Sequence, residues 1–146
     1  MKRGFTLVEL AVTLFVLALA AAVVAPALGR GVDSMRGRVE VSGFAAFLRT
    51  AREQAITRGE PQEVRVDPDA RELILATPGS DVTRLSRRFN FLQAIQADPP
   101  DALVVTFQPQ GLSSGGSFRI QAPGNRYYLV TVDPFTGRVS SRLADS

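Results

Sequence analysis

The side chains that this sequence offers for chemistry are few. Its 146 residues include neither histidine nor cysteine. These absences exclude a histidine general base, the usual serine triad, a thiolate metal site and any disulfide. Carboxylates, arginines, two tyrosines and Lys2 remain, and they form no catalytic constellation. We therefore expect no enzyme activity, no cofactor and no bound metal.

Glu9 is the acid with the most unusual sequence context. It directly precedes Leu10–Leu28, nineteen residues without a charge, which approach the roughly 20 needed to span a bilayer. An unpaired carboxylate in hydrocarbon costs on the order of a few kcal/mol, so Glu9 needs a partner or a special position. Cleavage after Gly4 would place the new amine of Phe5 one helical turn away. A helix dipole also favours a first-turn acid, and the residues leave both roles open.

The apolar run predicts a transmembrane helix with a defined orientation. Lys2 and Arg3 precede it, so the positive-inside rule places the N-terminus in the cytoplasm and the C-terminal part outside. The alternative is an ordinary secretory signal, cut near Ala18-Leu19-Ala20, that releases a secreted domain or enzyme. Glu9 argues against that alternative, because a secretory signal has no use for a charge at this point.

The residues Gly4-Phe5-Thr6-Leu7-Val8-Glu9-Leu10, followed by an apolar helix, resemble the processing signal of type IV pilins and type II secretion pseudopilins. The resemblance implies that prepilin peptidase cleaves between Gly4 and Phe5 and that the amine of Phe5 is methylated. It also implies that Glu9 pairs with the terminal amine of a neighbouring subunit. Residues 1–4 would be the leader, and residues 5–28 the membrane and filament-core helix, with a kink at Pro26.

The helix is predicted to continue over residues 29–58 as an amphipathic segment. Apolar residues recur there at spacings of three and four, apart from one slip near Gly43, and predict the face that packs on a sheet. They are Val32, Met35, Val39, Phe44, Phe47, Leu48, Ala51 and Ala55. Gly59 and Pro61 should end the helix.

Residues 59–146 read as a β-rich domain. Glu63–Val66 and Glu72–Leu75 flank the turn former Asp67-Pro68-Asp69-Ala70, which predicts a hairpin in which the aspartates make local backbone bonds. Further strands are expected at Val82–Phe91, Leu103–Phe107, Gly116–Gln121, Tyr127–Asp133 and Arg138–Leu143. Gln93–Ala102 is expected to be a proline-bearing loop. The fold class is α+β: a long N-terminal helix packed on an antiparallel sheet or small sandwich.

Two further stretches resemble the GspH/FimT group of minor pilins and pseudopilins. They are Phe47–Gly59 with the strand behind it, and the segment from Val105 through Gly115-Gly116-Ser117-Phe118 to Val139. This resemblance implies a minor pseudopilin of a type II secretion pseudopilus, in the bacterial inner membrane with a periplasmic domain. Its implied partners are other pilins or pseudopilins, prepilin peptidase, the inner-membrane assembly platform and secreted cargo.

A DNA-binding or pilus-initiating minor pilin of the FimT type is the alternative function. Lys2 and Arg3 belong to the expected leader, so the mature chain would keep 15 basic residues against 14 acids. Global charge therefore does not indicate nucleic acid. Arg138 and Arg142 are the residues near the C-terminus that could contact phosphates, but no series of aromatic residues accompanies them for base stacking.

Overall fold

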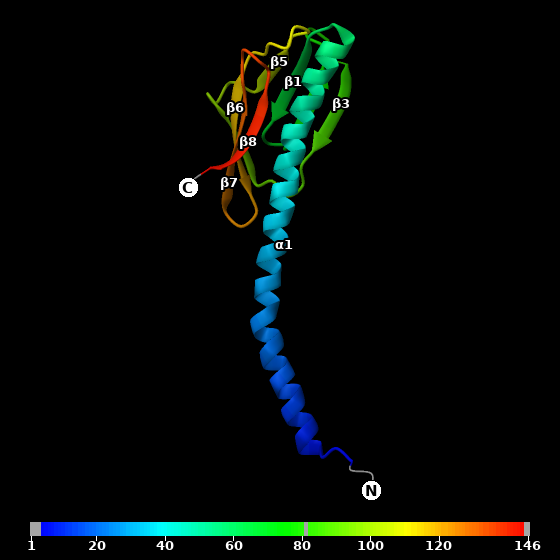
Figure 1. Cartoon of the computed structure of the whole chain (residues 1–146), viewed down its shortest axis with the longest axis vertical. Helices are drawn as coiled ribbons and strands as arrows, with labels where there is room; N and C mark the ends of the chain where they lie inside the picture. Colours follow the sequence, from blue (N-terminus) through cyan, green and yellow to red (C-terminus); the bar gives the residue numbers. More distant parts are fainter. Residues whose placement is uncertain (1–3, 81, 145–146) are drawn as a thin grey trace. The chain divides into compact units, whose positions relative to one another are not determined.

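A computed structural model of the chain describes residues 4–80 and 82–144, without the side chains of residues 26–30. The chain divides into two compact units, Met1–Asp33 and Ser34–Ser146, which are described separately. The helix α1 (Leu7–Arg58) contributes to both. Ser34–Ser146, called here the globular unit, also contains eight strands, which lie alongside the C-terminal part of α1 (Figure 1).

The strands form two antiparallel sheets of four strands each. Their order is β3-β2-β1-β5 in the first sheet and β4-β6-β7-β8 in the second. The strands are β1 (Gln62–Asp67), β2 (Glu72–Ala76), β3 (Thr83–Arg88), β4 (Ala94–Asp98), β5 (Val104–Phe107), β6 (Gly116–Ala122), β7 (Arg126–Val132) and β8 (Val139–Ala144). The α+β class predicted from the sequence, a long helix packed on an antiparallel sheet or small sandwich, is confirmed.

The helix α1 ends, and the chain turns between β1 and β2, where the local sequence predicts. The helix ends at Arg58, and Gly59 follows with φ of 66°, a left-handed conformation that glycine adopts without strain. In the β1–β2 turn the carboxylate of Asp67 accepts a 2.8 Å hydrogen bond from the backbone N–H of Ala70. This aspartate therefore serves the turn, as the sequence predicted.

The predicted loop over residues 93–102 is wrong in its first half, because Ala94–Asp98 forms strand β4. Ile95 and Ala97 point into the core, and the strand pairs with β6 along its whole length. The segment holds one β-branched residue and two alanines before Pro99 and Pro100, so its local strand signal is weak. The strand is therefore stabilised by its pairing with β6 rather than by the strand propensity of its own residues.

The predicted inner face of the helix is also wrong in part. Val32, Met35 and Val39 are 48%, 72% and 59% exposed. The face that is buried in the globular unit instead passes through Val41, Phe44, Ala45, Phe47, Leu48, Ala51 and Ala55. At about 100° per residue, Val39 lies roughly 200° around the helix from Val41, which is nearly the opposite side. The slip near Gly43 therefore marks a change of helix face.

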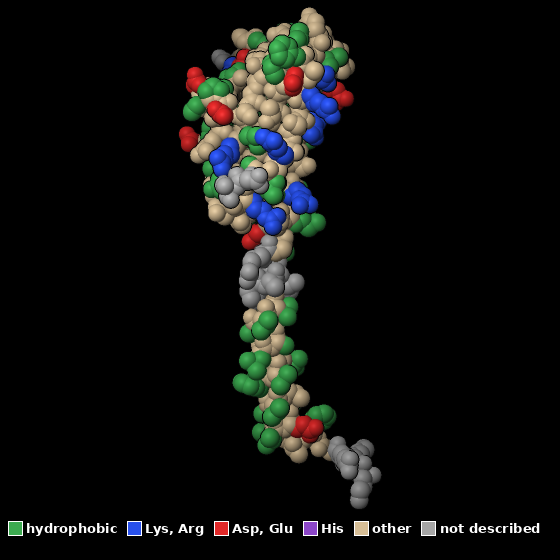
Figure 2. Space-filling view, turned by 60° about the vertical axis from the view of Figure 1, so that its left-hand side comes forward, with side chains coloured by type: hydrophobic (Ala, Val, Ile, Leu, Met, Phe, Trp, Pro, Cys, Tyr) green, Lys and Arg blue, Asp and Glu red, His purple; other side chains and the backbone are tan. Residues whose placement is uncertain are grey.

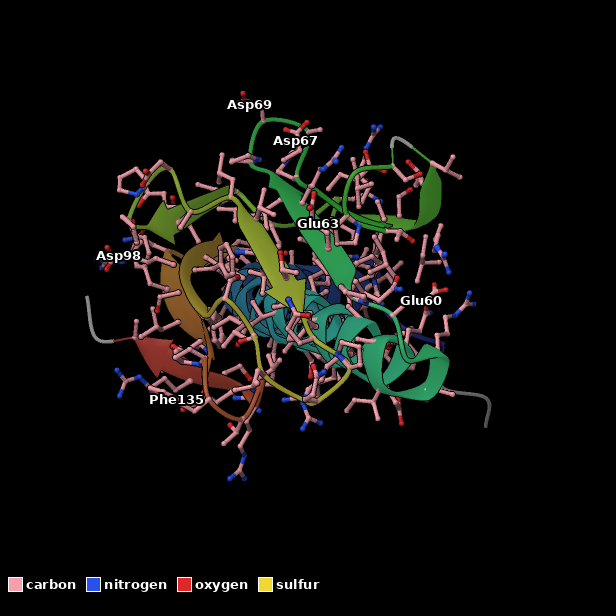
Figure 3. All side chains as sticks on the ribbon, turned by 90° about the horizontal axis from the view of Figure 1, so that it is seen from above. Glu60, Glu63, Asp67, Asp69, Asp98 and Phe135 are labelled. Carbon is pink, nitrogen blue, oxygen red and sulfur yellow. The ribbon has the colours of Figure 1, made fainter. Side chains whose placement is uncertain are left out.

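One hydrophobic core joins α1 to both sheets of the globular unit. Phe44 lies at its centre, with ring centroids 5.7 Å from Phe89 and 5.6 Å from Phe118. Figure 3 shows the green strands of the first sheet on one side of α1, and the orange and red strands of the second on another. A Cβ built on Gly37 would lie 2.9 Å from that of Ala122, so a side chain there would force helix and sheet apart.

Candidate assembly segment and basic surface pockets

The start of α1 is built by a threonine cap. The hydroxyl of Thr6 accepts a 3.2 Å hydrogen bond from the N–H of Glu9, and the Thr6 carbonyl accepts one of 3.1 Å from Leu10. Thr6 is therefore the N-cap and Glu9 the third helical residue, the spacing of a capping box. The sequence analysis missed this signal, Thr6-Leu7-Val8-Glu9, which fixes where the helix begins.

The side chain of Glu9 is exposed, and its carboxylate has no partner within the described part of the chain. Among residues 4–80 and 82–144 no side chain or backbone group forms a hydrogen bond or ion pair with it. Its place in the first turn suits the positive end of the helix dipole. It stands, however, beside Leu7, Val8 and Leu10, all more than half exposed. Glu9 is thus the one charge within a wholly apolar surface.

That surface is long and apolar enough to cross a bilayer. Within the part of the chain that could be searched, Leu7–Ala25 has a mean hydropathy of 2.6 and none of its residues is buried. The hydroxyl of Thr13 donates to the carbonyls of Leu10 at 2.8 Å and Glu9 at 3.0 Å. Apart from Glu9, the polar side chain within Leu7–Ala25 is therefore satisfied by its own backbone, as hydrocarbon requires.

Gly4, Phe5 and Pro26 are placed as follows. A Cβ on Gly4 would meet no atom within 4 Å, so contacts within the described chain do not require glycine there. Phe5 is 77% exposed. The helix continues through Pro26, whose side chain is among those outside the described set, and the kink stays a prediction.

Arg138 lies in a groove of about 960 Å³ between the end of α1 and the β7–β8 turn. Arg49 and Arg52 of α1 reach across, donating to the carbonyls of Val139 at 3.2 Å and Thr136 at 3.1 Å. Glu53 and Asp133 also line this groove. It is consequently mixed in charge.

Asp133 organises the β7–β8 turn. Its carboxylate accepts hydrogen bonds from the backbone N–H groups of Phe135 at 2.9 Å and Thr136 at 2.8 Å. The backbone N–H and then the hydroxyl of Thr136 lower the pKa of Asp133 from its ordinary value. The acid therefore stays ionised and serves the turn. Within the part of the chain that the structure describes, no group of three acids could hold a metal ion.

Arg142 lines a different pocket, of about 260 Å³, together with Arg38 and Arg126. The two arginines that the sequence analysis grouped as a nucleic-acid patch therefore face separate hollows. Arg38 stands on α1, Arg126 on β7 and Arg142 on β8. Residues so far apart in sequence give no common pattern, and only the tertiary fold brings them to one pocket.

Glu40 is a second residue that the sequence analysis missed. Its carboxylate accepts hydrogen bonds from three successive backbone N–H groups, those of Asn90 at 3.0 Å, Phe91 at 2.8 Å and Leu92 at 2.9 Å. This contact ties the loop between β3 and β4 to α1. No local signal could have found it, because 50 or more residues separate the partners.

Comparison with known proteins agrees with this architecture and with the N-terminal motif. Residues 40–137 match the family of the type II transport protein GspH, and residues 1–25 match the prokaryotic N-terminal methylation motif. The type II secretion system protein H of Xanthomonas campestris pv. campestris is 34% identical over 141 residues. That alignment covers 95% of this chain and 82% of the Xanthomonas protein.

Solved structures share the fold at low sequence identity. The type IV minor pilin FimU of Pseudomonas aeruginosa matches with a TM-score of 0.62 at 15% identity, covering 75% of this chain and 98% of FimU. The minor pseudopilin EpsH of the Vibrio cholerae type 2 secretion system matches with a TM-score of 0.52 at 19% identity, covering 75% of this chain and 96% of EpsH. The fold is therefore shared with both structures, and the sequence matches show the family: the chain belongs to the GspH family of type II transport proteins.

Proposed function

We propose that this chain is a minor pseudopilin of a type II secretion pseudopilus, a structural subunit that assembles with other pseudopilins into a filament. The observation that carries the proposal is the exposed, unpartnered carboxylate of Glu9 within an apolar helix surface. Family membership and the N-terminal methylation motif support it. The chain supports secretion through assembly and performs no reaction of its own.

The first step of the proposal is processing by prepilin peptidase. The enzyme removes residues 1–4 by cleaving between Gly4 and Phe5, and the new amine of Phe5 is methylated. The match of residues 1–25 to the N-terminal methylation motif supports this assignment. A Cβ at Gly4 would meet no atom within 4 Å, so a substitution there tests recognition by the peptidase without a clash in the described chain.

Membrane anchoring follows from the apolar segment. Leu7–Ala25 lies in the inner membrane, Lys2 and Arg3 keep the N-terminus in the cytoplasm, and the globular unit faces the periplasm. The carboxylate of Glu9 is then near or within hydrocarbon, where an unpaired charge is costly. A cationic amine at Phe5 of an adjacent subunit would neutralise it, and this pairing would join subunits at a fixed register.

The fold alone does not separate a secretion pseudopilus from a type IV pilus, because FimU and EpsH both share it. A minor pilin that binds DNA remains the alternative. Arg138 and Arg142 face separate pockets, and that of Arg138 also holds two acids. A DNA backbone is best bound by an uninterrupted basic surface. The separation of these two arginines therefore favours the DNA-binding alternative less.

Intact-mass and N-terminal analysis of membrane-extracted chain tests the proposal. Cells with prepilin peptidase should yield a chain that starts at methylated Phe5, and cells without it should yield the full chain. Gly4→Val should block processing even when the peptidase is present, with Gly31→Ala as a matched control, because Gly31 is exposed and its Cβ would also meet nothing. A chain that begins within or after residues 18–27 would show an ordinary secretory signal and refute the proposal.

A further inference from the structure

We propose that the arginine-lined pocket around Arg38, Arg126 and Arg142 binds the phosphate of an anionic phospholipid headgroup. Such binding would hold the globular unit on the bilayer surface before the subunit enters a filament. The inference rests on the membrane anchoring proposed above. It adds a second contact with the membrane, made by a folded surface rather than by the apolar helix.

The pocket lies wholly within the globular unit and has the chemistry of an anion site. Its three arginines come from three elements, and Ser42 and Ser141 line it beside them. Among the residues that the structure describes, no acidic side chain lines it. The planar guanidinium group of arginine matches the geometry of phosphate oxygens and binds them through paired hydrogen bonds.

Within residues 4–80 and 82–144, no acidic side chain neutralises these arginines. Among the described residues none of the three forms an ion pair, whereas Arg65, Arg84 and Arg88 each pair with a glutamate. Glu40, two residues along α1 from Arg38, is committed to the backbone of the loop between β3 and β4. Three like charges around one small pocket repel each other, so an anion bound there relieves the repulsion.

The short segment between the apolar helix and the globular unit, residues 26–33, keeps this pocket within reach of the bilayer. The apolar segment ends at Ala25 and the globular unit begins at Ser34, so at most about 30 Å of extended chain separates them. Arg38 follows Ser34 by roughly one helical turn. An anchored chain therefore carries the pocket on the part of the globular unit that is tied most closely to the headgroup layer.

Exposed apolar side chains beside the arginines favour a lipid over a water-soluble polyanion. Leu143 lines the pocket and is 58% exposed. Met35, which precedes Arg38 by roughly one helical turn in α1, is 72% exposed. Figure 2 shows arginine and hydrophobic side chains interspersed on one face of the globular unit. Basic and apolar groups side by side are typical of surfaces that bind at a membrane interface.

The experiment compares two bilayers with the full mature chain. The sequence contains no cysteine, so Ser140→Cys, on the exposed side of β8, provides a single labelling position. The chain is placed in nanodiscs of phosphatidylcholine alone or with phosphatidylglycerol, and energy transfer to a headgroup-attached acceptor is measured. We expect greater transfer with phosphatidylglycerol, and we expect added salt to remove the difference.

The decisive variant is Arg38→Gln/Arg126→Gln/Arg142→Gln. Each arginine near an anionic surface contributes roughly five-fold, so the triple substitution should lower the ratio of docked to free globular unit by roughly 100-fold. The matched control is Arg58→Gln/Arg84→Gln/Arg88→Gln, with the same change of charge at residues outside the pocket. The control should keep its response to phosphatidylglycerol, and thermal unfolding checks that both triple variants remain folded.

Equal transfer in the two kinds of disc would overturn the inference, as would an equal loss in both triple variants. A pocket variant that loses binding to duplex DNA, while the parent ignores lipid charge, would assign the pocket to nucleic acid instead. Retention of the chain in the discs after carbonate washing separates the two proposals. If the chain is retained but its energy transfer does not depend on lipid charge, only the headgroup site is refuted. If the chain is released from the discs, the membrane anchoring is refuted as well.

Discussion

The two units of this chain contain the same apolar residue types, which are exposed in the N-terminal unit and buried in the globular unit. In the N-terminal unit, every residue of Leu7–Ala25 is exposed. In the globular unit, phenylalanine, leucine and valine side chains are fully buried between α1 and two sheets. The difference teaches that the partners of the first unit are other molecules, whereas those of the second lie within the chain.

This division makes mutations separable. A substitution in the N-terminal unit should change association with lipid or other subunits and leave the unfolding free energy of the globular unit unchanged. A substitution in the core should do the reverse. The following predictions test whether the two units are as independent as their burial indicates.

Glu9→Gln should have the largest effect, on assembly alone. Glutamine removes the charge and leaves the hydrogen bond from the backbone N–H of residue 9 to the hydroxyl of Thr6 unchanged. Leaving the partner amine unpaired at low dielectric costs about 3 to 5 kcal/mol, so incorporation into filaments should fall by roughly 100-fold or more. Filament content is measured by immunoblotting of sheared filaments.

Thr6→Ala is the matched control for Glu9→Gln. It removes the cap, at a cost of about 1 kcal/mol to the helix start, and keeps the carboxylate. Incorporation should therefore persist. If Thr6→Ala fails to assemble while Glu9→Gln assembles normally, the role assigned to the charge of Glu9 is wrong.

Phe44→Ala should destabilise the globular unit by about 3 to 5 kcal/mol, because it opens a cavity among the rings of Phe89 and Phe118. Chemical denaturation monitored by circular dichroism measures this loss, and Phe44→Leu should cost less. Processing at Gly4 should continue in both variants. Loss of processing in a variant whose globular unit remains folded would contradict the independence of the units.

Glu40→Gln should destabilise the globular unit by about 2 kcal/mol. The amide oxygen accepts more weakly than a carboxylate, and the amide nitrogen cannot accept from the N–H groups of Asn90, Phe91 and Leu92. Hydrogen exchange should become faster at those three backbone amides. Glu53→Gln, on the exposed side of the same helix, should change neither quantity, and equal effects of both substitutions would rule out the contact as the cause.

Gln62→Met should give the smallest effect and the opposite sign. The side chain of Gln62 is fully buried at the start of β1, and its amide oxygen and nitrogen bond to no described residue. Methionine has a similar shape without the polar atoms, so the unfolding free energy should rise by about 1 kcal/mol. Gln96→Met, on an exposed strand position, should be nearly neutral. A decrease for Gln62→Met would show that the buried amide is satisfied in solution.

The helix α1 shows which features the spacing of apolar residues can predict and which it cannot. The apolar segment, the helix end at Gly59 and the β1–β2 hairpin were predictable, because each depends on residues close together in sequence. The positions of Met35 and Val39 were not. Their spacing fits a buried stripe, yet the sheets cover the face through Val41 and Phe44. Which face of a helix is covered depends on strands that follow it by many residues.

The sequence by itself determined the N-terminal signal, the apolar segment, the α+β class and the family resemblance, since these depend on local order and composition. Tertiary structure alone decided that Ala94–Asp98 becomes a strand, that Glu40 holds a distant loop, and that Arg38, Arg126 and Arg142 share a pocket. The physical reason is that each of these features joins residues far apart in the chain. Their contact energies arise only when packing of the core brings the partners together.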